Sequence, residues 1–151
     1  MRKRFFLGGA AALSALVALP FIVESSAGEV HVFKSRTCDC CAAWVRHMRA
    51  AGFTVTVTDV DNTAVERKRL GMPERFGSCH TARVDGYVLE GHVPATEVKR
   101  LLAAAPQAIG LAVPAMPVGS PGMEVGKRRD PYEVLLVDPA GAASVFASYP
   151  N

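Results

Sequence analysis

The sequence predicts an α/β domain built around a mixed β-sheet. Runs rich in β-branched residues alternate with segments of helical periodicity. A Cys-x-x-Cys pair, Cys38 and Cys41, directly follows the first strand-like run. Asp85-Gly86, between two further strand-like runs, is typical of a two-residue β-hairpin turn. The predicted order is therefore strand, cysteine turn, helix, strand, helix, hairpin and helix.

Residues 1–27 are expected to be an export signal. Three basic residues at positions 2–4 precede an uncharged apolar run at 5–23, and Ser25-Ser26-Ala27 offers small residues for cleavage. The alternative is an uncleaved membrane anchor, which needs about 20 apolar residues. Both interpretations place residues 28–151, a single domain, outside the cytoplasm, and we expect a periplasmic protein.

The basic excess of the chain belongs to this signal. Residues 1–27 hold three of the 17 Lys and Arg residues and one of the 14 Asp and Glu residues, which leaves a formal charge of +1 on the rest. A nearly neutral domain gives no reason to expect a nucleic-acid partner. We expect membrane contact only if the signal stays uncleaved.

The first predicted elements surround the cysteines. Residues 29–34 alternate like a half-buried strand. Residues 42–51 form a predicted helix that ends at Gly52, the usual C′ residue. Residues 53–60 are a second β-branched strand. The buried stripe of the helix is expected to contain Trp44, Val45, Met48 and Ala51.

The second half of the chain is also punctuated by turn residues. Thr63 and Glu66 are expected to form a capping box that opens a short charged helix. Strands at 79–84 and 87–92 flank the Asp-Gly turn, and Pro94 begins a helix through Ala105. An irregular loop rich in Pro, Gly and Met follows at 110–124, and then a C-terminal hairpin at 132–137 and 143–148.

A strand that leads into a Cys-x-x-Cys turn at the start of a helix is the arrangement of the thioredoxin-like fold, which we predict for residues 28–151. The helix N-terminus favours a thiolate. One hypothesis is therefore a thiol–disulfide oxidoreductase, with Cys38 as the more exposed nucleophile and Cys41 as the resolving thiol. Only in such a redox enzyme would these two residues be catalytic.

Cys40 is a third thiol that thioredoxins lack. A disulfide between the adjacent residues Cys40 and Cys41 would be strained. The hairpin register, with Val84 facing its turn partner, places Cys79 opposite His92, and the start of such a hairpin adjoins the Cys-x-x-Cys turn. We therefore expect Cys79 and His92 near the cysteine cluster, and His80 on the opposite face.

Four sulfur atoms and an imidazole favour Cu(I), with zinc as the second choice. Two methionines in the proline-rich loop add thioether sulfur, which Cu(I) accepts and zinc does not. The alternative is a purely structural role, in which the four cysteines form two disulfides that stabilise the domain. The predicted metal ligands are Cys38, Cys40, Cys41, Cys79, His92, Met116 and Met123.

Three motifs in this order, CDCC before Trp44, SCHTARVDGYVLEGHVPA and GLAVPAMPVGSPGME, resemble an exported metal-binding family long described as a domain of unknown function. Its members accompany copper-resistance genes and include CopG-type periplasmic copper proteins. The resemblance implies a thioredoxin-like fold, a cysteine-bridged site for one or several copper ions at CxCC, a role in copper redox handling, and other periplasmic copper-handling proteins as partners. Ala115 stands where the family usually has glycine.

Overall fold

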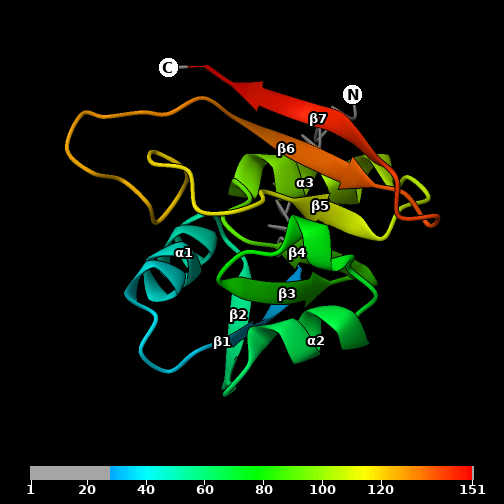
Figure 1. Cartoon of the computed structure of the whole chain (residues 1–151), viewed down its shortest axis with the longest axis horizontal. Coiled ribbons are helices and arrows are strands. Elements are labelled where there is room, and N and C mark those ends of the chain that lie inside the picture. The colour runs from blue at the N-terminus through cyan, green and yellow to red at the C-terminus, as the bar shows by residue number, and fades with distance from the viewer. Residues whose placement is uncertain (1–27, 151) are drawn as a thin grey trace, which may run out of the picture.

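A computed structural model describes residues 28–150 of the chain, so the predicted export signal lies outside the described residues. The seven strands of these described residues form one mixed sheet in the order β2-β1-β3-β4-β5-β6-β7 (Figure 1). Within the described part of the chain, no helix has the length and apolar character needed to cross a bilayer. The predicted α/β class with a central mixed sheet is confirmed.

The N-terminal half forms a β-α-β unit. Strand β1 (Glu29–Lys34) pairs in parallel with β2 (Thr54–Asp59), and α1 (Asp39–Ala50) connects them. After α2 (Thr63–Arg69) and a 3-10 turn (Glu74–Phe76), the chain returns antiparallel to β1. This return brings the start of the next strand to the end of β1, where the cysteine turn begins.

The C-terminal half extends the sheet on the other side. Strands β3 (His80–Val84) and β4 (Tyr87–Glu90) form the predicted hairpin, and α3 (Ala95–Ala104) leads to β5 (Gly110–Ala112), which runs parallel to β4. Two antiparallel strands complete the sheet, β6 (Tyr132–Val137) and β7 (Ala143–Tyr149). The C-terminal hairpin is thus confirmed, within the same sheet.

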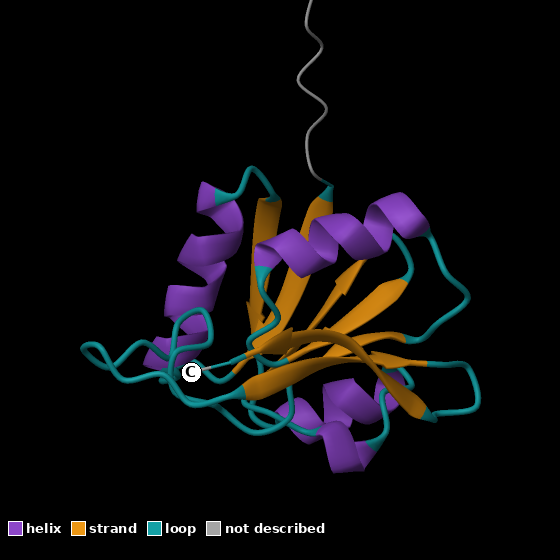
Figure 2. Ribbon diagram, turned by 90° about the horizontal axis from the view of Figure 1, so that it is seen from above, coloured by secondary structure: helices purple, strands orange, loops and turns teal. Residues whose placement is uncertain are grey.

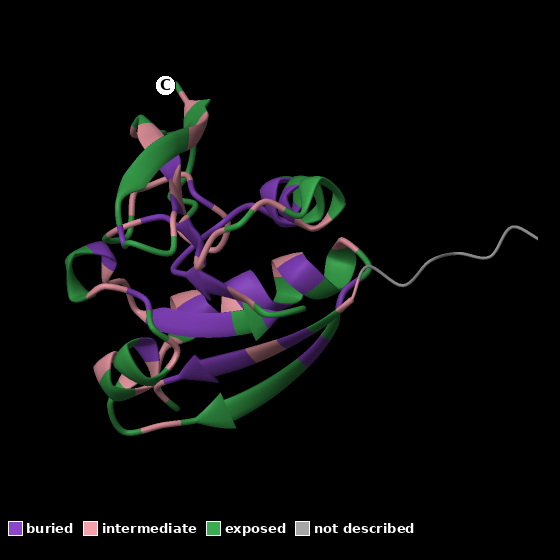
Figure 3. Cartoon of the chain, turned by 90° about the vertical axis from the view of Figure 1, so that its right-hand side faces the viewer, coloured by how far each residue is buried: buried purple, intermediate pink, exposed green. Residues whose placement is uncertain are grey.

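Helices cover both faces of the sheet (Figure 2). Because side chains alternate along a strand, neighbouring residues of β4 enter different cores. Leu89 packs in the larger core with residues of α1 and α3, such as Trp44 and Leu101. Val88 packs in a smaller core with Met72. Burial is concentrated in the central strands, whereas the edge strands β2 and β7 are mostly exposed (Figure 3).

Several predicted boundaries need correction, two of them at helix starts. Helix α1 begins at Asp39, three residues before the expected 42, so Cys40 and Cys41 lie inside its first turn. The N-cap of α2 is Asn62, whose side chain accepts a hydrogen bond from the Ala64 N–H at 2.9 Å, so the expected Thr63 capping box is wrong. Asparagine ranks above threonine as an N-cap residue, so the cap at position 62 is the favoured one.

The expected loop at 110–124 contains strand β5 at its start. A Cβ atom on Gly110 would lie 1.7 Å from the Val88 carbonyl oxygen, so only glycine lets this backbone approach β4. A three-residue strand beginning with glycine has almost no local strand signal. It is stabilised instead by its two sheet neighbours, β4 and β6.

Candidate metal centre

The cysteine motif forms the N-terminus of α1. Cys38 is the N-cap in extended backbone conformation (φ −85°, ψ 98°), and its N–H donates to the Ser35 carbonyl at 3.1 Å. Cys41, one turn in, is fully buried, while Cys38 is half-buried. The expected difference in exposure between the two cysteines is confirmed. Both lie at the helix N-terminus, where unpaired N–H groups would favour the thiolate form once the pair is reduced.

Cys38 and Cys41 are joined by a disulfide, with their Cα atoms 5.4 Å apart. Cys40 and Cys79 are free thiols. The Cys40 Sγ lies 3.4 Å from the Cys38 Sγ, so the third thiol touches the disulfide instead of pointing into solvent. The structure thus contains the oxidised form of the pair that the spacing singles out.

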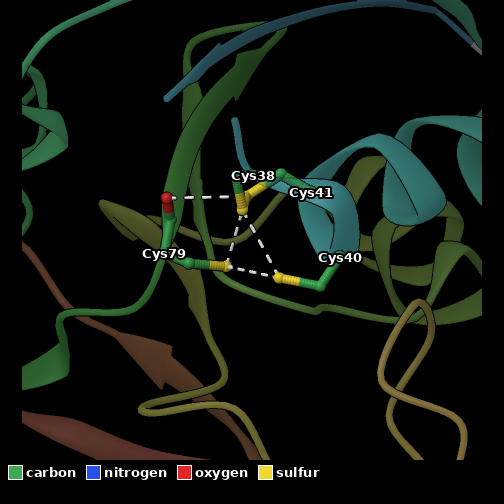
Figure 4. Close-up of side chains that lie close together, drawn as sticks. All are labelled: Cys38, Cys40, Cys41 and Cys79. Atoms are coloured by element: carbon green, nitrogen blue, oxygen red, sulfur yellow. Dashed lines mark hydrogen bonds between the residues drawn. A yellow bond between two sulfur atoms is a disulfide. The ribbon is translucent and has the colours of Figure 1, made fainter. Parts of the chain in front are cut away.

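Cys79 closes the group from the hairpin side. Its Sγ lies 3.4 Å from the Cys41 Sγ and 3.7 Å from the Cys40 Sγ (Figure 4). All four sulfur atoms lie within 4.8 Å of one another. The expectation that Cys79 joins the CxCC cluster is confirmed, and so is the convergence of four sulfurs.

The hairpin has the predicted register. Val84 pairs with Tyr87 and Thr81 with Glu90, and the Gly91 N–H donates to the His80 carbonyl at 3.0 Å. The register therefore continues to bring position 79 opposite position 92. The Cys79 Sγ lies 3.0 Å from Nε2 of His92, whose side chain is fully buried.

Hydrogen bonding fixes the tautomer of His92. Its Nδ1 lies 2.8 Å from the Pro121 carbonyl oxygen, which can only accept, so Nδ1 carries the proton. Burial lowers the pKa of His92 and keeps the ring neutral. The Nε2 lone pair therefore faces the Cys79 sulfur. A backbone carbonyl that holds a ring N–H is the usual support for a metal-binding histidine.

The expectation that His80 points away from Cys79 is wrong. Its Nδ1 lies 3.4 Å from the Cys79 Sγ, and Cys79, His80 and His92 form a second group with metal-ligand spacing. Regular strand β3 begins only at His80, so the alternation of faces does not extend back to residue 79. In the sequence, the only indication of His80 as a possible ligand is that it directly follows Cys79.

His80 is fully buried between two aromatic rings. Its ring centroid lies 4.5 Å from that of Trp44 and 5.0 Å from that of His92. Burial lowers the pKa of His80 to about 3, with His92 adding to the shift, so the ring is neutral. Its Nε2 has no hydrogen-bond partner among the described residues.

The proline-rich loop packs directly on the cysteine helix. A Cβ atom on Gly122, whose φ is +87°, would lie 2.8 Å from both the Cys40 carbonyl oxygen and the Trp44 nitrogen. Met123, the next residue, is half-buried, while Met116 is 47 % exposed and lines a surface pocket with Tyr132. Ligation by either methionine stays a prediction.

The other two histidines have partners elsewhere. His31 lies 2.8 Å from the Thr58 hydroxyl, and His47 accepts a hydrogen bond from the Ala95 N–H at 3.0 Å. Trp44 is fully buried, as predicted, and its indole N–H donates to the Val93 carbonyl at 2.8 Å.

The donor atoms at this centre are soft and largely neutral. Burial raises the pKa of the Cys79 thiol to about 12, and the adjacent Cys40 adds to the shift. A cation that binds here must displace thiol protons, which soft metals do well because thiolate is their preferred ligand. Sulfur with imidazole suits Cu(I) and zinc, and does not suit the oxygen-seeking ions Ca²⁺ and Mg²⁺.

Comparison with known proteins finds the same family that the sequence motifs resemble. The model of the family described as "Protein of unknown function, DUF411" matches residues 76–123. Two solved structures titled copper resistance protein CopG, Form 2 and Form 1, are each 45 % identical to the chain, with TM-scores of 0.78 and 0.77. Both alignments cover 82 % of this chain and 98 % of the other. No curated protein matches the sequence significantly. The chain therefore belongs to the family of the copper resistance protein CopG.

Proposed function

We propose that the protein binds copper as part of copper resistance and holds Cu(I) at the four-cysteine cluster. The observation that carries this proposal is the convergence of four sulfur atoms within 4.8 Å. Cys38, Cys40, Cys41 and Cys79 would bind as thiolates, with His92 as a nitrogen ligand and Met123 and Met116 as thioether ligands. Four thiolates that bridge can hold several Cu(I) ions.

The donor set favours copper over zinc. Structural zinc sites keep four ligands at the corners of a tetrahedron, each serving one ion. Here the Cys79 sulfur has several close neighbours: the Cys40 and Cys41 sulfurs at 3.7 and 3.4 Å, and nitrogens of both buried histidines. A sulfur with several donor neighbours is well placed to bridge two metal ions. Thiolates commonly bridge Cu(I) ions in this way.

The Cys38–Cys41 disulfide links copper binding to redox state. Formation of this disulfide from two thiolates releases two electrons. Two Cu(II) ions take up two electrons when they become two Cu(I) ions, so no further reagent is needed. We propose that the reduced pair donates electrons to Cu(II) and becomes the disulfide, whereas the reduced form stores copper that arrives as Cu(I). Anaerobic addition of Cu(II) to the reduced protein, followed by thiol counting and Cu(II) paramagnetic resonance, tests this step: loss of two thiols together with the Cu(II) signal supports it, and a persisting Cu(II) signal contradicts it.

Copper titration of the reduced, metal-free domain under anaerobic conditions tests the main proposal. We expect tight Cu(I) binding with sulfur-to-metal charge-transfer absorption in the ultraviolet. Cys40→Ser and Cys79→Ser should each weaken binding by at least about tenfold. Met72→Leu, a sulfur change in the smaller core, is the matched control and should leave binding unchanged. Equal Cu(I) binding in the wild type and a Cys40→Ser/Cys79→Ser double variant would overturn the proposal.

The disulfide also supports a second candidate, a thiol–disulfide oxidoreductase. Cys38 is the more exposed partner at a helix N-terminus, which is the position of the attacking thiol in such enzymes. This candidate predicts disulfide reduction or isomerisation that survives Cys40→Ser and loss of both loop methionines. Copper binding, by contrast, depends on Cys40. The Cys40→Ser variant therefore separates the two functions.

We propose a periplasmic location, supported by the basic and apolar N-terminal sequence. Other periplasmic copper-handling proteins would be the partners that deliver or receive the metal. N-terminal sequencing of the protein from a periplasmic extract tests this: a mature chain that starts at residue 28 supports it. An intact N-terminus in the cytoplasmic fraction contradicts it.

A further inference from the structure

Every polar group of Ser78, the residue before Cys79, makes a hydrogen bond. Its N–H donates to Oε1 of Glu90 at 2.7 Å, and its carbonyl accepts from Nη2 of Arg67 at 2.9 Å. Its hydroxyl donates to the Ala115 carbonyl in the proline-rich loop. A backbone segment held on three sides has little freedom to move.

Arg67 and Glu90 form a buried ion pair behind this segment. Nε of Arg67 lies 2.9 Å from Oε1 of Glu90, and the two side chains are 4 % and 0 % exposed. Arg67 also reaches Glu74 at 2.9 Å. A buried pair recovers little net stability, because removing two charges from water costs about as much as their attraction returns. Its effect therefore lies in the geometry that it fixes.

The same carboxylate also holds the other side of the Cys79-His80 dipeptide. The Thr81 hydroxyl donates to Oε2 of Glu90 at 2.6 Å, and Thr81 is fully buried. Glu90 thus bonds Ser78 with one oxygen and Thr81 with the other. The two residues that carry the sulfur and the second imidazole lie between these attachment points.

Two glycines make room for this arrangement. A Cβ atom on Gly77 would lie 2.9 Å from Nη1 of Arg67, although its backbone conformation suits any residue. A Cβ atom on Gly91 would lie 2.6 Å from the Ser78 hydroxyl and 2.5 Å from the Val113 carbonyl, at a φ of +71°. Both glycines therefore serve the close approach of groups that hold Ser78.

We propose that Arg67, Glu90 and Thr81 form a clamp that positions Cys79 against the other cysteines and His92. They are positioning residues: each acts through the segment at 78–81, and none belongs to the two groups of donor side chains. The clamp sets the 3.4 Å approach of Cys79 to Cys41 and the 3.0 Å approach to His92. Its consequence for copper rests on the proposed function, whereas its consequence for the Cys79 thiol does not.

The thiol consequence is tested on the reduced, metal-free protein. Alkylation by iodoacetamide, followed by peptide mass spectrometry, gives separate rates for Cys79 and for the CxCC cysteines. We expect Thr81→Val and Arg67→Met to raise the Cys79 rate about tenfold, the effect of losing one hydrogen bond to a charged group. Thr81→Ser, which keeps the hydroxyl, should restore the wild-type rate. Arg69→Met, which removes the exposed Glu66–Arg69 ion pair on the same helix, is the matched control.

The copper consequence is tested with the same variants. Thr81→Val should weaken Cu(I) binding about tenfold, while Thr81→Ser and Arg69→Met should not. Unchanged Cys79 rates in both Thr81→Val and Arg67→Met overturn the clamp, even if melting temperatures fall. Thr81→Val, which keeps the shape of the side chain, decides the question if Arg67→Met does not fold. Absence of Cu(I) binding in the wild type contradicts the proposed function, and the alkylation rates still decide the clamp.

Discussion

The thiol of Cys79 and Nε2 of His92 lie 3.0 Å apart across the β3–β4 hairpin, although 13 positions separate them in the chain. Since Nδ1 of His92 is held by the Pro121 carbonyl, the ring presents its other nitrogen to the sulfur. His92 is therefore oriented for a metal before any metal binds.

We expect His92→Gln to weaken Cu(I) binding by at least about tenfold, because it removes an oriented nitrogen donor next to the Cys79 sulfur. Competition with a chromophoric Cu(I) chelator measures the change. His31→Gln removes a histidine whose side chain bonds Thr58 on the neighbouring edge strand β2, away from the cluster, and serves as the control. Equal affinities of the two variants would exclude His92 from the site.

Cys79 should alkylate slowly in reduced protein at pH 8. Its pKa of about 12, raised by burial and by Cys40, keeps the thiol protonated well above neutral pH. Its alkylation rate should therefore keep rising as the pH is raised above 8, because the thiolate fraction keeps growing. A rate that has already levelled off at pH 8 would contradict the protonated thiol.

Met123→Leu should weaken Cu(I) binding more than Met116→Leu. Met123 follows Gly122, which packs on the backbone of Cys40, whereas Met116 is 47 % exposed. Leucine keeps the volume of methionine and removes only the sulfur, so folding should be little affected. X-ray absorption at the copper edge, compared between each copper-loaded variant and the wild type, shows whether a sulfur ligand has been lost. A larger loss of Cu(I) affinity in Met116→Leu would make Met116, not Met123, the ligand.

Gly122→Ala should destabilise the domain by about 1–3 kcal/mol more than Gly71→Ala. Both glycines have positive φ, +87° and +84°, but only Gly122 faces helix α1, because nothing lies within 4 Å of a Cβ on Gly71. The comparison isolates the contact between the loop and the helix. Denaturant unfolding measures both free energies, and equal losses would show that the loop does not press on the helix.

Copper should quench the fluorescence of Trp44, the only tryptophan in the sequence. Its ring lies 4.5 Å from His80, whose Nδ1 is 3.4 Å from the Cys79 sulfur. The emission therefore reports on events at the cysteine cluster. Titration of the reduced protein should remove most of the signal, and Cys79→Ser should require more copper for the same loss. Emission that stays constant while copper binds would place the metal elsewhere.

Local patterns predicted much of this structure. Strand β1 has the expected bounds, and the hairpin register followed from a two-residue turn and the alternation of side chains. That register alone brought Cys79 to His92. The start of α1 was predicted too late because positions 39–41 have no apolar periodicity and a cysteine is not a usual N-cap.

Features that depend on long-range packing were missed. Strand β5 exists because its neighbours pair with it, and His80 turns inward because the regular strand begins there. Arg67 and Glu90 resemble ordinary surface charges in the sequence, since charged residues are rarely buried. Only the fold shows that they lie behind the Ser78 backbone. The sequence supplied the ligand candidates, but not the groups that hold them.

The packing of Gly122 on Cys40 has a consequence for folding kinetics. The cluster draws its donors from positions 38–41, 79–80 and 92, and its closing contacts from 121–122, so it combines segments of high sequence separation. Such contacts are expected to form late in folding, because bringing distant segments together costs the conformational entropy of the chain between them. A newly emerging chain therefore offers only the isolated CDCC tetrapeptide, and the complete donor set is a property of the finished fold. Premature metal capture would trap the thiols before Cys79 arrives.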